Sequence, residues 1–598
     1  MEVQTAATAS SASTGSTTLA DLLTIAATKH ASLVAQRHKV ADKWVEVSYA
    51  ELGQIVKEFS LGLMDLGIES GHKVGILSNT RPEWTYSDFA ILCAGATVVP
   101  IYQTNSPQEC EYVLHHSESK AVVVEDDAQL EKVRQVRDQL PNLEHIIAIE
   151  PIAADDVVTI DSVRKRGATR PEADLDKRVA AVTPDDVATY IYTSGTTGPP
   201  KGCIIDHRNW RSMLDMAERE DVLVANEVVF LFLPLAHAFA RLIQLIAIDV
   251  GSTIAYWERD PKKIVPNLME VKATYFPSVP RIFEKIYTLA TSNAPDKQQL
   301  EQAVELGVKV RQMQTRGEDI PADLLAAFNK ADEALFVNVR NLFGGNMKQC
   351  VTGAAPIAPE ILRFFYACGV PVMEGYGMTE TSTAATINTL DNFRIGSVGR
   401  AMEGCEIKIA DDGEVLIKGP NIFRGYYKNE DATKETIVND WLHTGDLGRL
   451  DEDGFLYITG RKKDIIITAG GKNITPANWE NTMKQNRWVS QAVMYGDRQP
   501  YLTALVTLDP EEIVPWATEQ GIDDTNLPSL CLNEKVRALI QGVIDDVNQR
   551  YAQVEQVKKF TILDHDLSQE TGELTPTMKV KRNVCYEKYD GTLNAMYT

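Results

Sequence analysis

The sequence predicts an α/β protein with a large N-terminal domain, a small β-rich subdomain and a small C-terminal α+β domain. In the N-terminal part, apolar strand-like segments alternate with helix-like segments, which is typical of parallel strands joined by helices. After Gly396 the pattern changes to short strands separated by turns. The chain of 598 residues is also too long for one hydrophobic core, because domains rarely exceed about 250–300 residues.

The N-terminal part can be followed element by element. Residues 1–18 are rich in Ser, Thr and Ala and contain no Lys or Arg, so we predict a disordered tail there rather than a targeting signal. Helices are expected over residues 49–66 and 84–96, and strands over residues 73–77, within 96–102, and over 121–124 and 145–149. Residues 292–341 are polar and helix-forming, which predicts a surface helical hairpin with a solvated face that carries Glu301, Glu305, Lys309 and Arg311.

The C-terminal part begins with the β-rich subdomain. Strands are expected over residues 406–409 and 414–418, with a turn at 411–413, and another hairpin turn is expected at 451–454. Charged residues replace apolar ones at 460–464, and we predict the domain boundary there, with a large domain over 19–460 and a small domain over 461–598. The remaining ~130 residues alternate strands and helices and suffice for an independent domain.

Composition excludes several classes of function. The chain has 44% hydrophobic and 24% charged residues, as ordinary globular proteins do. Its net charge of −23 argues against non-specific binding of nucleic acid. Its eight cysteines form no C-x-x-C pair and show no zinc spacing, so we expect reduced thiols in the cytoplasm. No run of about 18 apolar residues is present, so no membrane-spanning helix is expected.

The segment YIYTSGTTGPPKG at 190–202 is the most informative part of the chain. An apolar strand enters a loop with Thr193, Ser194, Gly195, Thr196 and Thr197, and Lys201 follows. Glycines let backbone N–H groups turn toward one point, and four hydroxyls and one ammonium add donors that suit an oligophosphate. It is not a Walker A loop, since two prolines separate the last loop glycine from the lysine. The alternative is a flexible Gly/Thr turn.

A second motif, EGYGMTET, lies at 374–381, about twenty residues after the turn Gly353-Ala354-Ala355-Pro356. Gly375 and Gly377 flank Tyr376, so the backbone can pass close to a flat ligand on which the tyrosine stacks. Thr379 can donate to a phosphate, and Glu380 is an oxygen ligand of the type that Mg²⁺ prefers. Alone, this motif would equally fit a structural tyrosine in a turn.

Three further motifs follow in the C-terminal half. Asp446 in LHTGD could accept both hydroxyls of a ribose, or could simply accept hydrogen bonds within a turn. The cluster GRKKD at 460–464 contains Arg461 and Lys463 and precedes Gly470-Gly471. The segment GELTPTMKVKR at 572–582 contains Lys579. Alone, the last two motifs would be a solvated charged face and a basic turn.

Together the five motifs resemble those of the acyl-adenylate-forming enzymes, which include acyl-CoA synthetases, adenylation domains of peptide synthetases and firefly luciferase. The resemblance runs from about residue 20 to the end. The segments FLPLAHAFAR (232–241), FPSVPRIFEKIY (276–287) and IIITAGGKNITPANW (465–479), with the helical insertion at 292–341, resemble long-chain acyl-CoA synthetases of the bacterial and bubblegum types. Thr577-Met578 stand where the wider superfamily usually has Ser-Gly, a change that long-chain members share.

The resemblance implies an adenylate-forming large domain, a mobile small domain and roles for single residues. The implied nucleotide-binding residues are Thr193, Ser194, Gly195, Thr196, Thr197, Lys201, Gly353, Ala354, Ala355, Tyr376, Gly377, Asp446 and Arg461. The implied catalytic residues are Thr379, Glu380 (also the Mg²⁺ ligand), His237 and Lys579, which would reach the α-phosphate and the substrate carboxylate. Lys463 would be the hinge between domains, and Gly470-Gly471 would face the pantetheine of coenzyme A (CoA).

The implied activity is that of a long-chain fatty acid:CoA ligase. It would use ATP and Mg²⁺ to form acyl-AMP and pyrophosphate, and then transfer the acyl group to CoA, in the cytoplasm and with possible peripheral membrane contact. Two alternatives stay open: a fatty-acyl-AMP ligase that loads a carrier protein, and a non-catalytic adenylate- or lipid-binding homologue. The carrier-loading branch has an insertion near the small domain, and residues 396–461 show no obvious extra block. A non-catalytic homologue should have lost Lys579, Glu380 or Asp446, and all three are present.

Overall fold

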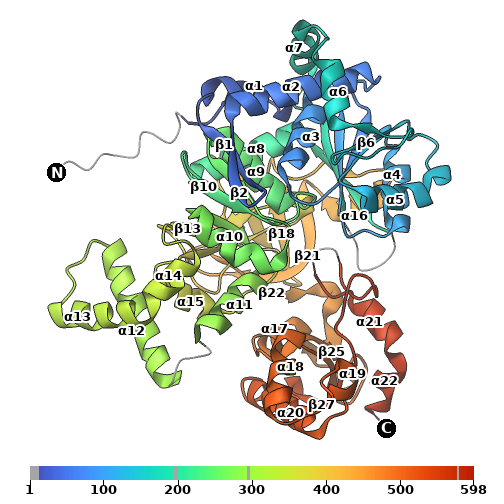
Figure 1. The fold of residues 1–598 in the computed structure, drawn as a ribbon. Coiled ribbons are helices and arrows are strands. Elements are labelled where there is room, and N and C mark those ends of the chain that lie inside the picture. Colours follow the sequence, from blue (N-terminus) through green and yellow to red (C-terminus); the bar gives the residue numbers. More distant parts are fainter. Residues whose placement is uncertain (1–11, 194–198, 292–296, 576–577, 598) are drawn as a thin grey trace.

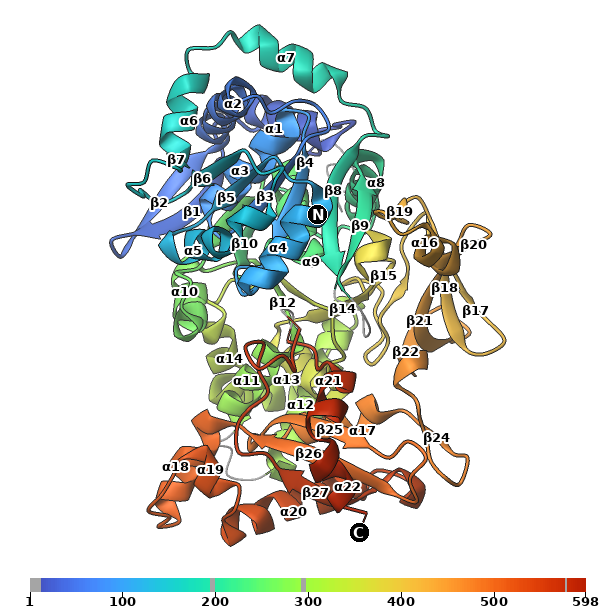
Figure 2. The ribbon, with the colours of Figure 1, turned by 90° about the vertical axis from the view of Figure 1, so that its right-hand side faces the viewer.

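The predicted α/β architecture is confirmed by the computed structural model, which describes residues 12–193, 199–291, 297–575 and 578–597. A large body contains two extended sheets covered by helices, and a smaller body formed by the C-terminal residues lies against one end of it (Figures 1 and 2). Among the described residues, no helix combines the length and apolarity needed to cross a bilayer.

The first extended sheet has eight strands in the order β19-β9-β8-β4-β3-β5-β6-β7. They are β3 (Lys73–Leu77), β4 (Thr97–Ile101), β5 (Ala121–Val124), β6 (His145–Ala148), β7 (Val158–Thr159), β8 (Val187–Thr193), β9 (Lys201–Asp206) and β19 (Gly425–Tyr426). The strands from β8 to β7 run parallel, whereas β8 and β9 form an antiparallel pair. The phosphate-loop candidate is therefore the connection between β8 and β9, and Ser194, Gly195, Thr196 and Thr197 lie outside the described residues.

Six helices belong to this half of the large body. They are α2 (Tyr49–Asp65), α3 (Pro82–Cys93), α4 (Pro107–Ser117), α5 (Asp127–Gln135), α6 (Ile160–Gly167) and α7 (Glu172–Ala181). The helices expected over residues 49–66 and 84–96 are thus present as α2 and α3, within a few residues at each end.

The second extended sheet has nine strands in the order β16-β15-β14-β13-β12-β10-β11-β1-β2. They are β1 (Val34–Val40), β2 (Lys43–Ser48), β10 (Val228–Leu231), β11 (Thr253–Tyr256), β12 (Tyr275–Ser278), β13 (Gln349–Thr352), β14 (Val372–Tyr376), β15 (Thr386–Ile387) and β16 (Arg400–Ala401). The helices of this half are α1 (Leu19–Lys29), α8 (His207–Arg219), α9 (Ala238–Val250), α10 (Ile264–Val271), α11 (Pro280–Thr291) and α15 (Pro359–Cys368). Because β13 and β14 are parallel neighbours, the turn that begins at Gly353 and the motif that begins at Glu374 meet at one sheet edge, at the carboxyl ends of these strands.

The tail predicted over residues 1–18 is too long. Thr14 donates through its backbone N–H to the backbone oxygen of Asp249 at 3.1 Å, and Ser13 donates through its hydroxyl to the Asp249 carboxylate at 2.9 Å. Thr18 forms a capping box at the start of α1 with Asp21. Serine and threonine are good helix-capping residues, so a composition that suggests disorder can also start a helix. Residues 1–11 lie outside the described part.

The insertion at 292–341 is helical, as predicted, but its solvated face is partly wrong. It contains α12 (Lys297–Thr315), α13 (Ala322–Ala331), a π-helix η3 (Asp332–Phe336) and α14 (Val337–Leu342). Glu301, Glu305 and Lys309 are exposed. The Arg311 side chain, in contrast, is partly buried, and its Nη2 lies 3.8 Å from Asp332 Oδ1. The helix α12 packs against α15, so the insertion is attached to the core rather than forming a free hairpin.

The β-rich subdomain and the small domain follow. The predicted short strands appear as β17 (Glu406–Ile409), β18 (Glu414–Lys418), β20 (Ile437–Val438), β21 (Trp441–Leu450) and β22 (Leu456–Arg461), with α16 (Glu430–Thr436) beside them. The small domain contains β23 (Ile466–Ile467), β24 (Asn473–Ile474), β25 (Val489–Tyr495), β26 (Leu502–Leu508) and β27 (Val557–Ile562). Its helices are α17 (Pro476–Lys484), α18 (Pro510–Glu519), α19 (Leu527–Leu530), α20 (Glu534–Asn548), α21 (Arg582–Lys588) and α22 (Asp590–Ala595).

The small domain has hydrophobic cores of its own. One of them is built from Ile466 onward and includes Trp479 and Val506. The short 3₁₀-helix η5 (Lys462–Asp464) connects β22 to this domain. The domain boundary at 460–464 remains a prediction, and these separate cores support it.

Candidate active site

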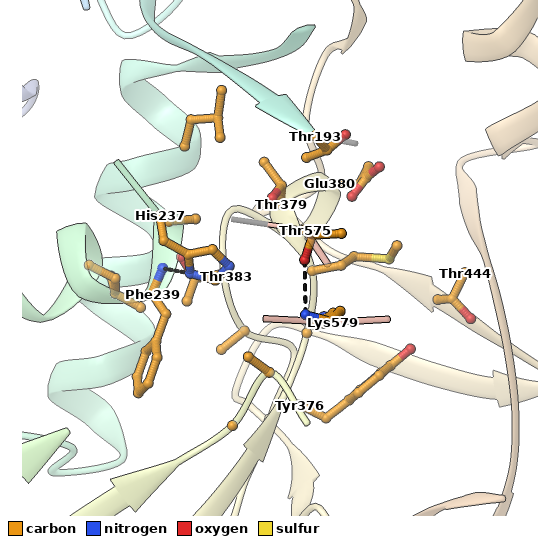
Figure 3. Close-up of a pocket in the computed structure, with 18 of the residues that line it drawn as sticks. Thr193, His237, Phe239, Tyr376, Thr379, Glu380, Thr383, Thr444, Thr575 and Lys579 are labelled. Carbon is orange, nitrogen blue, oxygen red and sulfur yellow. Dashed lines mark hydrogen bonds between the residues drawn. The ribbon is translucent and has the colours of Figure 1, made fainter. Parts of the chain in front are cut away.

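A cavity of about 690 Å³ lies between the large body and the small domain. Its lining includes Thr193 at the end of β8, Gly353 after β13 and Tyr376 at the end of β14. The small domain contributes Lys579 to the same cavity (Figure 3). The carboxyl ends of strands are where open α/β sheets bind ligands, so the cavity lies where the topology predicts a site.

The structure brings most of the predicted site residues together. The predicted residues that line the cavity are Thr193, Lys201, His237, Gly353, Ala354, Tyr376, Gly377, Thr379, Glu380, Arg461, Lys463 and Lys579. Ala355 is exposed and Asp446 is buried, and neither is among the lining residues, although Gly445 next to Asp446 is. Gly470 and Gly471 lie at an exposed turn between β23 and β24, also outside the cavity.

The predicted phosphate end of the cavity combines Lys201 and Glu380 around one tyrosine. The Tyr426 hydroxyl donates to Glu380 Oε1 at 2.7 Å, and Lys201 Nζ lies 4.8 Å from the centre of the same ring. Burial, and then the charge of Glu380, raises the pKa of Tyr426, so this hydroxyl stays protonated and donates. Tyr426 was not predicted from the sequence. It reaches the site because β19 pairs with β9, more than 200 residues earlier in the chain.

The predicted ribose end of the cavity lies at Thr444 and Gly445, next to the buried Asp446, which is 5% exposed. Its Oδ1 accepts a hydrogen bond from Arg461 Nε at 2.7 Å, and its Oδ2 accepts one from the Tyr376 hydroxyl at 2.7 Å. Asp446 and Arg461 are direct partners in the antiparallel β21–β22 pair, which explains why two motifs 15 residues apart act together. The carboxylate is thereby held in one orientation, with lone pairs left for a ligand.

The bond from Tyr376 to Asp446 leads to a testable expectation. In Tyr376→Phe, the ring remains but Asp446 loses a donor, so the KM for ATP should rise about tenfold, the effect of one hydrogen bond to a charged group. Tyr457→Phe is the matched control, because the Tyr457 hydroxyl donates to Asp451 at 3.3 Å and Tyr457 does not line the cavity. Equal KM values in the two variants would contradict this role of Tyr376.

His237 caps the first turn of α9 beside the cavity (Figure 3). Its Nδ1 accepts the backbone N–H of Phe239 at 3.2 Å, so a neutral ring carries its proton on Nε2. Burial, and then the charge of Lys579, lowers the pKa of His237 to about 4. At neutral pH this side chain is therefore an uncharged hydrogen-bond donor at the cavity wall and not a cation.

The helix α9 is held in place by a fully buried ion pair. Arg241 donates to the Asp88 carboxylate of α3 through Nη2 at 2.6 Å and through Nε at 3.1 Å. Gln244 donates to the same carboxylate at 3.0 Å. The arginine in FLPLAHAFAR thus has a structural role, since it fixes the helix that presents His237 and the apolar wall.

The apolar wall extends from His237 along α9 and away from the charged groups. The lining residues of this arm are Ala217, Val222, Phe239, Leu242, Ile243, Ile246 and Met402. From His237 to Ile246 the helix rises about 13 Å. The cavity therefore joins a polar end to a long apolar arm.

Lys579 extends from a loop that is tied to the small domain. Thr575 and Lys579 close this loop, with the Thr575 N–H donating to the Lys579 oxygen at 2.8 Å and the Lys579 N–H donating to Thr575 Oγ1 at 3.0 Å. At its base, the buried Glu573 accepts from Lys588 and Tyr589, and its pKa is lowered to about 2 against the effect of burial. Met578 has φ of +62°, a conformation that favours glycine, so the glycine usual at this position in the superfamily suits the same turn.

The side chain of Lys579 extends into the cavity, where it remains accessible although the walls of the cavity surround it. Burial, and then the charge of Arg461, lowers its pKa, and the carboxylates of Asp446 and Glu380 oppose this shift. A polyanionic ligand stabilises the charged form of a lysine in these surroundings, because its negative charge offsets both the burial and the charge of Arg461.

The arrangement suits a ligand with several negative charges and one metal ion. Among the described residues, no group of three or more His, Cys, Asp or Glu side chains could hold a metal. Glu380 is a single buried carboxylate at the phosphate end. That matches Mg²⁺, which usually binds through one or two carboxylates together with substrate phosphates.

Comparisons with known proteins agree with this geometry. A family model described as AMP-binding enzyme matches residues 25–427, and one described as AMP-binding enzyme C-terminal domain matches residues 463–598. The chain is 38% identical to the long-chain-fatty-acid–CoA ligase FadD15 of Mycobacterium bovis, over 93% of this chain and 92% of that protein. It is 35% identical to the long-chain-fatty-acid–CoA ligase ACSBG2 of Xenopus laevis, over 95% of this chain and 82% of that protein.

Solved structures share the fold at lower identity. The adenylation domain of a carboxylic acid reductase from Segniliparus rugosus, in complex with AMP and a carboxylic acid, has a TM-score of 0.78 at 19% identity and covers 98% of this chain and 95% of its own. The o-succinylbenzoate CoA synthetase of Bacillus subtilis, in complex with ATP and magnesium ion, has a TM-score of 0.67 at 22% identity and covers 94% of this chain and 98% of its own.

Proposed function

The chain belongs to the AMP-binding enzyme family, and we propose that within it the chain is an AMP-forming long-chain-fatty-acid–CoA ligase. The observation that carries this proposal is the cavity itself, in which a polar end with Lys201, Arg461 and Lys579 continues into an apolar arm. A nucleotide phosphate chain suits the first part and a fatty acyl chain suits the second. The full-length relatives named as ligases of this kind support the same substrate class.

In the first step, the fatty-acid carboxylate attacks the α-phosphorus of ATP, which forms acyl-AMP and releases pyrophosphate. No protein nucleophile is needed, so catalysis consists of positioning and charge neutralisation. Lys201 and Thr193 would hold the outer phosphates, and Asp446 with Arg461 would hold the ribose. Lys579 would neutralise the charge that converges on the α-phosphate and the carboxylate.

Mg²⁺ would bind at Glu380 together with the phosphates, where it would supply charge neutralisation. The Tyr426 hydroxyl occupies Oε1 of this carboxylate and so fixes its orientation, which leaves Oε2 for the ion. The neutral His237 would donate from Nε2 at the junction between the polar end and the apolar arm.

In the second step, the thiol of CoA attacks the acyl carbonyl and AMP leaves. We propose that the small domain rotates about Lys463 between the steps, which withdraws Lys579 and brings the turn at Gly470-Gly471 to the cavity. The position of that turn outside the cavity fits this proposal, because the turn would be needed in the second step alone. A cytoplasmic location and peripheral contact with a membrane, from which fatty acid could be taken up, remain predictions.

The experiment that tests this function uses a panel of C8 to C22 acids with ATP, Mg²⁺ and CoA, analysed by mass spectrometry. Palmitate or oleate should be converted to the CoA thioester, with AMP and pyrophosphate as co-products. Acyl-AMP that accumulates at millimolar CoA without thioester would overturn the proposal in favour of a carrier-loading ligase. If neither product forms with any acid, a non-catalytic binding protein is indicated.

The apolar arm predicts how chain-length preference can be changed. Ala217 lines the arm on the α8 side, and Ala217→Leu should shorten it. Each methylene group that no longer fits should lower kcat/KM about fourfold, so the preferred acid becomes shorter. Ile246→Val removes one methyl group from the α9 side of the arm and should favour longer acids. Melting temperatures would show whether both variants are folded. If both are folded and their chain-length preferences are unchanged, the acyl chain binds elsewhere.

A further inference from the structure

The contact between the small domain and α11 contains ion pairs that the proposed reaction does not use. Arg281 Nη2 of α11 lies 2.6 Å from Asp509 Oδ2, and Lys285 Nζ, one turn further along, lies 2.8 Å from Glu511 Oε2. Both basic residues belong to the large domain, and both acidic residues belong to the start of α18 in the small domain. Figure 1 shows α11 at the boundary with the small domain, close to α17 and α18.

Asp509 performs two separate tasks with its two oxygens. Its Oδ1 accepts the backbone N–H of Glu511 at 3.0 Å and so caps α18 within the small domain. Its Oδ2 accepts the hydrogen bond from Arg281. The Asp509 side chain is 10% exposed, so its partner is fixed by geometry, in contrast to a free surface charge.

Two further charged groups lie near the first pair. Arg281 Nη1 also lies 3.8 Å from Glu284 Oε2, one turn along the same helix. Burial raises the pKa of Glu284, against the charges of Arg281 and then of Lys484 in α17. Burial lowers the pKa of Lys484, against the charges of Glu480 and then of Glu284. The two faces are thus complementary in charge along one turn of α11.

These contacts lie at a different place from the covalent connection. The chain enters the small domain once, through η5 at residues 462–464, and one covalent connection leaves the domain free to rotate. A second point of attachment on α11 favours one orientation of the domain over the others. In this orientation the loop with Lys579 lies in the cavity.

We propose that Arg281 and Lys285 are positioning residues for the first half-reaction, because their ion pairs with Asp509 and Glu511 hold the small domain in the orientation that places Lys579 in the cavity. This inference rests on the proposed two-step function. Both pairs must break when the domain rotates, so their strength sets the balance between the two orientations. A surface ion pair changes such an equilibrium by up to about fivefold, enough to affect each half-reaction without locking the domain.

Asp509→Asn is the sharpest variant. Asparagine is as good a helix cap as aspartate, so α18 should keep its first turn, whereas the amide can no longer pair with the Arg281 charge. Glu512→Gln is the matched control. Glu512 lies on the same helix, α18, but its partner Arg487 also belongs to the small domain. Lys285→Glu should act like Asp509→Asn, and Lys285→Glu/Glu511→Lys should restore the attraction with reversed charges.

The two half-reactions are measured separately: pyrophosphate release from ATP and palmitate without CoA, and thioester formation from supplied palmitoyl-AMP with CoA. Asp509→Asn should lower the rate of pyrophosphate release about threefold to fivefold. The rate of thioester formation should be unchanged or higher. Moderate salt should reduce the rate of pyrophosphate release more in the parent enzyme than in the variant, which keeps only the Lys285–Glu511 pair. Equal loss of both half-reactions, the same loss in Glu512→Gln, or no rescue by the charge reversal would overturn the proposal.

Hydrogen exchange without any substrate separates this inference from the proposed function. Backbone amides of α11 and of the first turn of α18 should exchange faster in Asp509→Asn than in the parent and in Glu512→Gln. If the parent forms no acyl-AMP but this difference is observed, the proposed function fails while the ion pairs still hold the domain. If acyl-AMP forms and the exchange rates are equal, the positioning role is wrong.

Discussion

Lys579→Ala is expected to lose the first half-reaction, acyl-AMP formation, by about 10²–10³-fold, the usual cost of removing one charge-stabilising group from an active site. Thioester formation from supplied acyl-AMP should be largely spared, because the lysine would leave the cavity before that step. Pyrophosphate release and thioester formation, measured separately, check this expectation. Equal loss of both half-reactions would refute the role of Lys579.

Lys581→Ala is the matched control for Lys579→Ala. Lys581 is a neighbouring basic residue whose N–H donates to the Glu573 oxygen, and it does not line the cavity. Both half-reactions should survive in this variant.

Lys579 also predicts a pH dependence. Its ammonium form is the active one, and burial together with Arg461 holds its pKa below the usual value of 10.5. The kcat/KM for adenylation, which reports the free enzyme, should therefore fall as pH rises and should do so before an ordinary lysine would lose its proton. Thioester formation from acyl-AMP should show no such decline from this group.

Lys463→Pro is expected to separate the half-reactions in the opposite sense. Lys463 lies in the 3₁₀-helix η5, whose backbone φ of about −50 to −70° is compatible with proline. The variant should therefore keep the present orientation and release pyrophosphate in a single turnover. The proline ring would prevent Lys463→Pro from adopting the backbone angles of the second orientation, so acyl-CoA production should collapse.

Lys463→Ala removes the side chain without restricting the backbone, and it should retain both steps. Acyl-CoA made by Lys463→Pro at the parental rate would show that the hinge lies elsewhere in the chain.

Short stretches of sequence were enough to predict much of the site. The glycine-rich loop, the EGYGMTE motif and the TGD and GRKKD motifs each span a few neighbouring residues, and their joint resemblance to acyl-adenylate-forming enzymes implied a nucleotide site. Most of the predicted site residues that the structure describes line one cavity, whereas Ala355, Asp446 and the Gly470-Gly471 turn are not among its lining residues. The strands at 73–77 and 121–124 were predictable for a similar reason, since their apolar residues are contiguous.

Contacts between distant segments could not be predicted from local patterns. The hydrogen bond from Tyr426 to Glu380 depends on β19 reaching β9, and the Arg241–Asp88 pair depends on α9 packing against α3. Arg311 was placed on a solvated face because its spacing fits one, but its partner Asp332 comes from the next helical segment of the insertion. The end of the predicted tail is ordered because Asp249, far along the chain, accepts its hydrogen bonds.

The sequence by itself determined the class of the protein, the order of its elements and the residues that carry the chemistry, because these depend on side-chain type and short spacing. Only the tertiary structure decided that the polar end and the apolar arm form one cavity, that Tyr376 orients Asp446, and that α11 meets the start of α18. Such arrangements arise from packing between segments hundreds of residues apart. A local pattern contains no information about which distant surface will complete it, and burial and charge pairing in the folded chain make that choice.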